Sequence, residues 1–547
     1  DQDAIYAYTK ATEINPENPN GWYELGMLYY ALNRKETAIS SFEKAIKYDS
    51  KFEKAWYSKS EILMGMGKVE EGIACVDKVL ELNPYRSEAW LAKGNYLLDI
   101  EKCEEAISYF ENAVKTGEKY IEAWCGLGKA LSKVGKIPDA IRAFDKAIDL
   151  NPEYYEAWYQ RGVAYSQMGN FPFGLISFEK ACELAPKYAP AWLERGNVLA
   201  LLSKNDEAIK AYDRVLELEP RNYKAWLSIG VCLGNLGNYE EGISAIDKAM
   251  EFGKELDNAL CEKGNILQKA GRMEEAIDCI NKAISLNKMN KKAWLLIGNL
   301  LFSVGRNDEA KIAYEKALEI MPNYSDAFCG LGKIYENEGK HSESLEFYLK
   351  AIAISPNNSD AWLGKAISHF RLNEREEAIE SYRRALELRP DNADAWCSYG
   401  TALYITGRID ESIDAFNKAV ELNPNLEKGW CNRGTALFEA GKIEDALSSF
   451  DMAIKIKPDY DKAWYDKGNA LLKIERYDSA IQCFDEALRI KSDNEKAWFG
   501  AATVLYKLGK RKEAIDYLDR ALELKPDYEK ASKFKELCEK EAVGLNE

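Results

Sequence analysis

The sequence predicts an all-α fold, a solenoid built from repeats of 34 residues. The first observation is that all 13 tryptophans lie in one register of this period, with Leu260 and Phe328 at its two remaining places. The second is that no insertion interrupts the series between Trp22 and Trp498. Accidental spacing does not give such a register, and a fixed period of this length is the sequence signature of stacked supersecondary units. Because the units follow one another without a gap, we expect no β-strand.

Glycine and proline mark where the helices of each repeat begin and end. With the tryptophan counted as position 4, position 15 is glycine in ten of the fifteen complete units. We expect the first helix to end there in a left-handed cap, because glycine adopts positive φ without strain. Eleven of the 15 prolines fall at position 32, where they end the second helix. The ten glycines are Gly67, Gly135, Gly169, Gly237, Gly271, Gly305, Gly339, Gly407, Gly441 and Gly509.

Residue size alternates within the second helix of the repeat. Position 24 is bulky and apolar, as at Phe42, Tyr314 and Phe450, whereas positions 20 and 27 are small. We expect the large side chains to pack against these small residues and so to fix the helix spacing.

The pattern resembles that of the tetratricopeptide repeat (TPR) family, whose unit is a helix-turn-helix of this length. The residues that carry the resemblance in one unit are Trp430, Arg433, Gly434, Leu437, Ala446, Phe450, Ala453 and Pro458. The resemblance implies a right-handed superhelical solenoid whose first helices line a concave groove. We expect a partial repeat with a second helix only over residues 1–18, fifteen complete repeats over residues 19–528, and a C-terminal capping helix over residues 529–547.

Composition narrows the choice of partner and compartment. The formal charge of −16 argues against a nucleic-acid partner, since phosphate binding requires a surplus of Lys and Arg. No apolar run is long enough to span a bilayer, so no membrane partner is expected. Neighbouring helices in a stack lie about 8 to 10 Å apart, farther than a disulfide allows. We therefore expect Cys397 and Cys431 to be free thiols and the location to be cytoplasmic.

Candidate peptide-binding residues come from the outer arc of the first helix. On a helical wheel, positions 2, 5, 6, 9, 12 and 13 face away from the core, and the resemblance places them on the concave groove. Position 5 is uncharged throughout, position 9 often carries asparagine, whose amide both donates and accepts, and position 12 is frequently aromatic. The candidates are Tyr57, Asn95, Asn197, Asn265, Asn299, Phe302, Phe370, Tyr404, Phe438, Tyr465, Asn469 and Tyr506.

Two alternatives stay open for these residues. The aromatic side chains could fill seams between neighbouring first helices, and the asparagines could simply be solvated. Family members that hold chaperone tails grip carboxylates with Lys at position 5, but no position 5 is charged here. The resemblance therefore does not extend to a dicarboxylate clamp.

No catalytic, cofactor-binding or metal residue is predicted, and we expect a protein that is not an enzyme. His341 and His369 are the only histidines, and neither belongs to a recognised catalytic or metal motif. The first hypothesis is a protein-protein interaction scaffold that binds a peptide or protein segment in its groove. The second is the targeting array of a larger enzyme, arranged as in O-linked N-acetylglucosamine transferases, with its catalytic part outside this chain. The third is a self-assembling structural protein.

The N-terminal end suggests a weak homodimer. In the expected partial repeat, the apolar face around Ala4, Ile5 and Tyr8 lacks the first helix that covers it in other units, and exposed apolar patches favour association. Pairing of two N-terminal ends is one outcome, and fraying of an incomplete unit is the other.

Overall fold

The computed structural model describes residues 2–253 and 255–543, which form 32 α-helices and no β-strand. The all-α prediction is therefore confirmed. None of the described helices combines the length and the apolar character that crossing a lipid bilayer requires.

The chain divides into two compact units, Asp1–Ala276 and Ile277–Glu547. The boundary falls inside the repeat that has Leu260 in place of tryptophan. The helices of the first unit are α1 (Gln2–Ile14), α2 (Pro19–Ala31), α3 (Lys35–Tyr48), α4 (Glu53–Gly65), α5 (Val69–Leu82), α6 (Ser87–Asp99), α7 (Cys103–Thr116), α8 (Ile121–Lys133), α9 (Ile137–Leu150), α10 (Tyr155–Gln167), α11 (Phe171–Leu184), α12 (Ala189–Leu201), α13 (Asn205–Leu218), α14 (Tyr223–Leu236), α15 (Tyr239–Phe252) and α16 (Leu256–Lys269).

Helix α17 (Met273–Leu286) contains the boundary. The helices of the second unit are α18 (Lys291–Ser303), α19 (Asn307–Ile320), α20 (Ser325–Asn337), α21 (His341–Ile354), α22 (Ser359–Arg371), α23 (Arg375–Leu388), α24 (Ala393–Ile405), α25 (Ile409–Leu422), α26 (Glu427–Glu439), α27 (Ile443–Ile456), α28 (Asp461–Lys473), α29 (Tyr477–Ile490), α30 (Glu495–Lys507), α31 (Arg511–Leu524) and α32 (Glu529–Val543).

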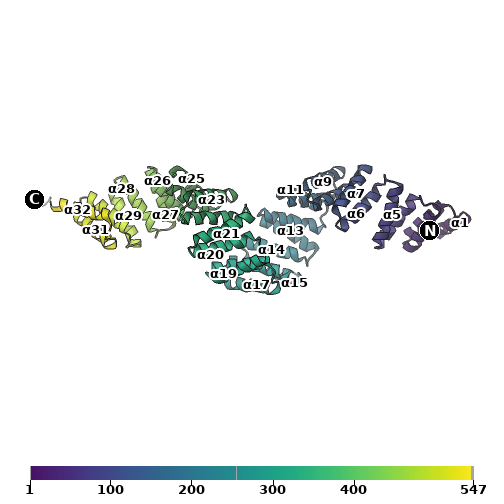
Figure 1. Ribbon diagram of the computed structural model, residues 1–547, viewed down its shortest axis with the longest axis horizontal. Coiled ribbons are helices and arrows are strands. Elements are labelled where there is room, and N and C mark those ends of the chain that lie inside the picture. Colours follow the sequence, from purple (N-terminus) through teal and green to yellow (C-terminus); the bar gives the residue numbers. More distant parts are fainter. Residues whose placement is uncertain (1, 254, 544–547) are drawn as a thin grey trace. The chain divides into compact units, whose positions relative to one another are not determined.

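Consecutive helices pack against one another within each unit, as the ribbon in Figure 1 shows for α26 to α29. The even-numbered helices from α2 to α30 are the first helices of their pairs. Within each unit, most of them also contact the next first helix, as α8 contacts α10 and α24 contacts α26. We call the surface that these helices share the first-helix face. The division into repeat units that the sequence suggests stays a prediction.

The turn inside each pair has the left-handed residue that the sequence predicts. All ten glycines at position 15 have positive φ, between 74° and 88°. In the second unit, for example, Gly441 N donates to Phe438 O at 3.0 Å and Lys442 N donates to Leu437 O at 2.9 Å. The five remaining repeats reach the same left-handed conformation without glycine, at Asn33, Glu101, Ser203, Asn373 and Glu475.

Each tryptophan ties its helix to the turn that precedes it. All 13 indole N–H groups donate to the backbone oxygen six residues earlier, at 2.7 to 3.1 Å. The acceptor is usually the proline carbonyl at position 32, as Pro424 is for Trp430. Leu260 and Phe328 have no such donor, so their turns lack this bond.

The two helices of a pair are held close by a ring that lies against a glycine. A Cβ built on Gly434 would lie 2.6 Å from Phe450 Cε1, and one on Gly128 would lie 2.5 Å from Phe144 Cε1. Nonbonded carbon atoms do not approach so closely, and the close-packed interior leaves the ring no room to move away. The sequence predicts that the position-24 ring packs against positions 20 and 27. The structure adds the glycine at position 8, on the first helix, as a contact that determines the spacing.

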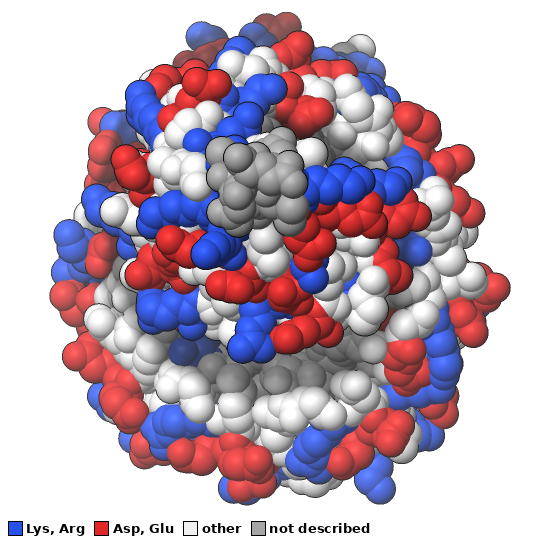
Figure 2. Space-filling view, turned by 90° about the vertical axis from the view of Figure 1, so that its left-hand side faces the viewer, with Lys and Arg blue, Asp and Glu red and all other residues white. Residues whose placement is uncertain are grey.

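On the end of the molecule drawn in Figure 2, basic and acidic side chains are intermixed. Along the described helices, many basic and acidic side chains form ion pairs one helical turn apart, such as Lys316 with Glu319 at 2.7 Å and Arg520 with Glu523 at 2.7 Å. Exposed pairs of this kind contribute little to stability. The stability of the units therefore depends mainly on the buried apolar contacts.

We predict that Gly434→Val destabilises the second unit by about 1–3 kcal/mol through overpacking. One repeat of the chain naturally has Ser60 in place of the glycine and Val76 in place of the ring, and both side chains are fully buried. Gly434→Ser should therefore cost less when it is combined with Phe450→Val than the sum of the two single changes. Chemical denaturation followed by circular dichroism measures the free energy of unfolding of the wild type, the three single variants and the double variant. Strictly additive effects would contradict a ring contact at Gly434.

Candidate functional site

A small cavity lies on the first-helix face of the second unit, between α24, α26 and α28. It has a volume of about 210 Å³ and is lined by Thr401, Tyr404, Ile405, Phe416, Asn432, Thr435 and Lys462. Three consecutive first helices, α24, α26 and α28, each supply part of the wall. An aromatic ring and several hydrogen-bonding groups thus face one small volume.

The polar side of this cavity is a chain of hydrogen bonds across three helices. Lys462 Nζ donates to Asn432 Oδ1 at 3.0 Å, and Asn432 Nδ2 donates to Thr401 Oγ1 at 3.4 Å. These contacts hold the amide in one orientation. A lysine ammonium has three N–H donors, so Lys462 is able to donate to a ligand in addition.

An aspartate of α28 adjoins the same cavity. Thr435 Oγ1 donates to Asp466 Oδ2 at 3.2 Å, and the Cys431 thiol lies 3.9 Å from the same oxygen. Burial raises the pKa of the Asp466 carboxyl, while Lys462 and the two donors act in the opposite direction. The carboxyl is therefore a local acceptor whose charged form is disfavoured.

The cysteines nearby are not arranged for chemistry. Burial raises the pKa of the Cys397 thiol to about 11 and that of the Cys431 thiol to about 12. Both stay protonated at neutral pH, and a thiol in that form is a poor nucleophile. Neither cysteine forms a disulfide. Cys397 occupies position 5, where a dicarboxylate clamp would need lysine.

The first unit has a larger cavity on its own first-helix face, between α12, α14 and α16. Its volume is about 450 Å³, and Asn197, Leu227, Val231 and Glu262 contribute to its lining. Of the predicted site residues in this unit, Asn197 lines the cavity, whereas Tyr57 and Asn95 belong to α4 and α6.

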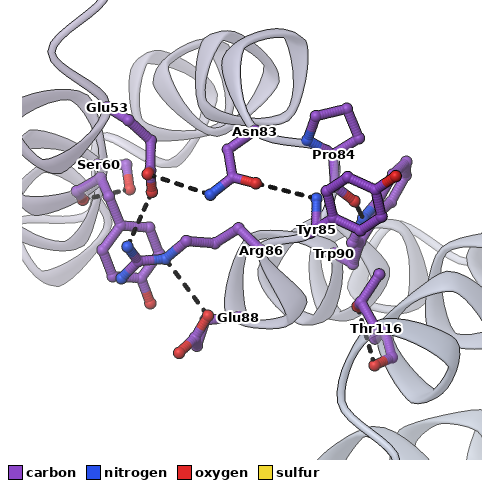
Figure 3. Close-up of polar contacts among 11 residues, drawn as sticks. Glu53, Ser60, Asn83, Pro84, Tyr85, Arg86, Glu88, Trp90 and Thr116 are labelled. Carbon is purple, nitrogen blue, oxygen red and sulfur yellow. Dashed lines mark hydrogen bonds and ion pairs between the residues drawn. The ribbon is translucent and has the colours of Figure 1, made fainter.

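The ring of Tyr57 is covered from within the chain. The Arg86 guanidinium carbon lies 4.2 Å from the ring centroid. Figure 3 shows Arg86 between Glu53 and Glu88, with Nη1 2.8 Å from Glu53 and Nε 3.3 Å from Glu88. Asn83 also donates to Glu53, at 3.2 Å. Burial raises the pKa of Tyr57 to about 12. One face of this candidate ring is therefore occupied.

Two predicted asparagines satisfy buried tyrosines. The Tyr212 hydroxyl donates to Asn197 Oδ1 at 2.9 Å, and the Tyr314 hydroxyl donates to Asn299 Oδ1 at 2.8 Å. Both tyrosines occupy position 24, where seven of the fifteen complete repeats have phenylalanine, which has no hydroxyl. A buried hydroxyl needs a partner, so these asparagine oxygens are engaged in the fold. The Asn197 amide nitrogen also donates to Glu194, at 3.3 Å.

The other predicted asparagines have different surroundings. Asn265 Nδ2 donates to Glu262 at 3.2 Å, Asn95 is exposed, and Asn469 hydrogen-bonds the Tyr465 hydroxyl. They therefore do not form one continuous row of equivalent amides.

The structure brings together three of the predicted aromatic residues. Tyr404, Phe438 and Tyr465 are half-buried and pack against the same hydrophobic cluster of α24 to α30. Phe302 is also half-buried, on α18. Phe370 has the Arg375 guanidinium 4.3 Å from its ring centroid.

Helix α32 reaches the last of the candidates. The ring of Tyr506 packs edge-on against Phe534 of α32, at 5.2 Å between centroids. Tyr506 is therefore partly covered by the C-terminal helix.

Several polar residues of the cavity were missed by the sequence analysis. Thr401, Asn432, Thr435, Lys462 and Asp466 were not selected, although they lie on the predicted outer arc. A signal was present: Lys428, Lys462 and Lys496 occupy position 2 of three successive units. Among the described residues, no group of three or more His, Cys, Asp or Glu side chains is placed to hold a metal ion.

We predict that Asp466→Asn stabilises the chain at neutral pH. The folded pKa of Asp466 lies above the unfolded value of about 4, so its contribution to stability is fully present below that pH and is lost as pH rises through the folded pKa. Asparagine keeps an acceptor for Thr435 and has no charge to bury. The unfolding midpoint should rise near neutral pH and change less in acid. Asp493→Asn, at an exposed turn residue, is the control, and an Asp466→Asn effect that is independent of pH would contradict the assignment.

Comparisons with known proteins agree with this architecture. Models described as tetratricopeptide repeat match residues 19–52, 53–86, 121–154, 143–172, 189–222, 211–243, 258–290, 431–495 and 465–529, and one described as TPR repeat matches residues 2–33 and 400–441. Residues 286–399 match the model of the cilia and flagella-associated protein 70 C-terminal domain. A search of curated proteins returned no significant match.

Two solved structures illustrate the similarity. The APC/C hetero-tetramer Cut9-Hcn1 shares 16% identity with this chain, covers 90% of it and 98% of the Cut9-Hcn1 chain, and has a TM-score of 0.48. YrrB, described as a TPR protein with an unusual peptide-binding site, shares 25% identity, covers 34% of this chain and 95% of its own, and has a TM-score of 0.32. With the repeat models matched along the sequence and helix pairs stacked throughout both units, the chain belongs to the tetratricopeptide repeat family.

Proposed function

We propose that this protein is a non-catalytic interaction scaffold that binds a peptide or protein segment on the first-helix face of α24, α26 and α28. Stacked helical repeats offer extended surfaces on which binding is the usual role. The observation that carries the proposal is the cavity lined by Thr401, Tyr404, Asn432 and Lys462. It combines an apolar ring with directional polar groups, as binding sites commonly do.

The chemistry of the cavity favours a backbone segment with an apolar anchor. Asn432 and the threonines are able to hydrogen-bond peptide groups whatever the side chains are. Tyr404 and Phe438 present half-buried rings on which an apolar side chain of the ligand would pack. A carboxylate clamp is disfavoured, because Cys397 is neutral and the Asp466 carboxyl adjoins the cavity.

Other features of the sequence analysis stay predictions. These are the cytoplasmic location, the pairing of N-terminal ends, and the two alternative roles as the targeting array of an enzyme or as a self-assembling protein. The alternative roles predict different binding partners for this chain. Binding of a peptide segment on the first-helix face would favour the scaffold over the other two roles.

We predict that a photo-reactive benzoylphenylalanine in place of Phe438 crosslinks a partner segment in cell extract, identified by mass spectrometry. Tyr404→Asp in the same protein should reduce this product about tenfold or more, because it places a charge where an apolar anchor would be buried. The same photo-reactive group in place of the exposed Leu349 of α21 is the control. Identical products from positions 438 and 349, or products that survive Tyr404→Asp, would place the ligand elsewhere.

A further inference from the structure

In several repeats, a Lys or Arg side chain of the first helix lies over the tryptophan ring and forms an ion pair with a carboxylate of the preceding second helix. Arg161 Cζ lies 4.3 Å from the Trp158 ring centroid, and its Nη1 lies 2.8 Å from Asp145. We call this pair, formed by position 7 and by position 25 of the preceding unit, the covering bridge. The ion pair recurs as Lys59 with Glu43, Lys93 with Asp77, Arg195 with Glu179, Lys263 with Asp247, and Lys467 with Asp451, the Lys263 pair standing in the repeat that has Leu260 in place of tryptophan.

The covering bridge is replaced at Trp396. Position 7 there is Tyr399, and position 25 of the preceding unit is Arg383. Arg383 is the only basic residue at this position in the complete units. The acidic residues there are Glu43, Asp77, Glu111, Asp145, Glu179, Asp213, Asp247, Glu315, Asp451, Asp485 and Asp519. The groove over Trp396 therefore lacks the ion pair found in these six repeats, and one of its walls carries a basic residue where most repeats have an acidic one.

A cavity occupies the place of the missing bridge. It has a volume of about 520 Å³ and lies between α23, α24 and α25, of which α23 and α25 are labelled in Figure 1. Trp396 and Tyr399 lie one turn apart on α24, pack edge to face at 6.1 Å between ring centroids, and both line it. Leu386, Leu403 and Ala415 complete the apolar lining. Such a surface suits a large apolar side chain.

The groove over Trp464 provides the internal comparison. It is larger, about 1040 Å³, but Lys467 and Asp451 form the covering bridge within it at 2.6 Å. Lys467 Nζ also lies 5.5 Å from the Trp464 ring centroid. The same place in the repeat is therefore polar at Trp464 and apolar at Trp396.

The charges around the Trp396 cavity indicate what should accompany an apolar side chain. Lys418 of α25 and Arg383 of α23 both line it. Their carboxylate partners are one turn away on their own helices: Glu421 lies 3.0 Å from Lys418, and Glu380 pairs with Arg383. Exposed pairs one turn apart contribute only tenths of a kcal/mol. A carboxylate of a ligand is able to compete with them.

Three carboxylates also border the cavity and oppose a negative ligand. Glu387 is paired with Arg384 at 2.8 Å, and Glu411 is paired with Arg408 at 2.7 Å, so both are largely compensated. Asp414 lines the cavity on α25, and no ion pair of it is found among the described residues. Asp414 is therefore the group whose removal should favour an acidic ligand.

We propose that the Trp396 cavity is a second interaction site, distinct from the first-helix face, for a partner protein segment in which a large apolar residue stands next to Asp or Glu. The apolar side chain enters the cavity and packs against Trp396 and Tyr399. The neighbouring carboxylate pairs with Arg383 and Lys418. The site takes the position that a covering bridge closes in other units.

Selection of a displayed library of random peptides on the full chain tests this proposal. Variant Arg383→Asp/Tyr399→Lys rebuilds the covering bridge and should fold, since the same pair is native elsewhere in the chain. We expect the enriched peptides to combine a large apolar residue with an adjacent acid. Their affinity for this variant should fall about tenfold or more, equivalent to 1.4 kcal/mol. The single exposed change Arg383→Glu, at a side chain with 59% exposure, should weaken binding in the same direction.

Controls separate this site from other outcomes. Asp451→Asn, in the Trp464 groove, and Tyr404→Asp, on the first-helix face, should leave the affinity of the selected peptides unchanged. Asp414→Asn should increase it severalfold. Enrichment of peptides with Lys or Arg next to the apolar residue, weakened by Asp414→Asn, would overturn the proposal in favour of a cationic ligand. Failure to enrich any peptide sensitive to Arg383→Asp/Tyr399→Lys would overturn it altogether.

Discussion

In most of the repeats, the fit of one ring against one glycine sets the geometry on which the rest of the helix pair depends. At Gly434 and Gly128, the absence of a side chain lets a buried phenylalanine of the second helix approach the first helix closely. Because interiors are close-packed, this distance determines which other groups meet. In the α12–α13 pair, an equivalent close approach lets the Tyr212 hydroxyl donate to Asn197. The hydrogen bond from the tryptophan indole to the preceding turn then fixes the first helix of the next pair relative to that turn.

Much of the local structure could be predicted from single residues. Gly441 predicted a left-handed cap because glycine is the residue that adopts this conformation without cost, and its φ is 78°. Glu101 and Ser203 could not be predicted in this way, since neither favours positive φ. The surrounding helix pair imposes the conformation there, and the register of the tryptophans was the information that located these turns.

The candidate site was harder to predict, for a geometric reason. A helical wheel shows which arc of one helix faces outward, but the cavity on the second unit combines Thr401, Asn432 and Lys462 from three different helices. Their meeting depends on the rotation between successive repeats, which the sequence does not state. Asn299 illustrates the opposite case. Its position suggested a ligand contact, yet its oxygen accepts the hydroxyl of Tyr314, a pairing visible only once both helices are placed.

The near-neighbour character of the packing has an evolutionary consequence. Within each unit, a first helix such as α26 contacts its own partner α27 and the adjacent helices on either side, and contacts of this range recur along the array. Duplication or loss of a whole repeat therefore joins surfaces that already match. Under such changes, the number of grooves varies while each groove keeps its own residues. A site confined to one groove, such as that at Trp396, could be inherited, copied or lost independently of all the others.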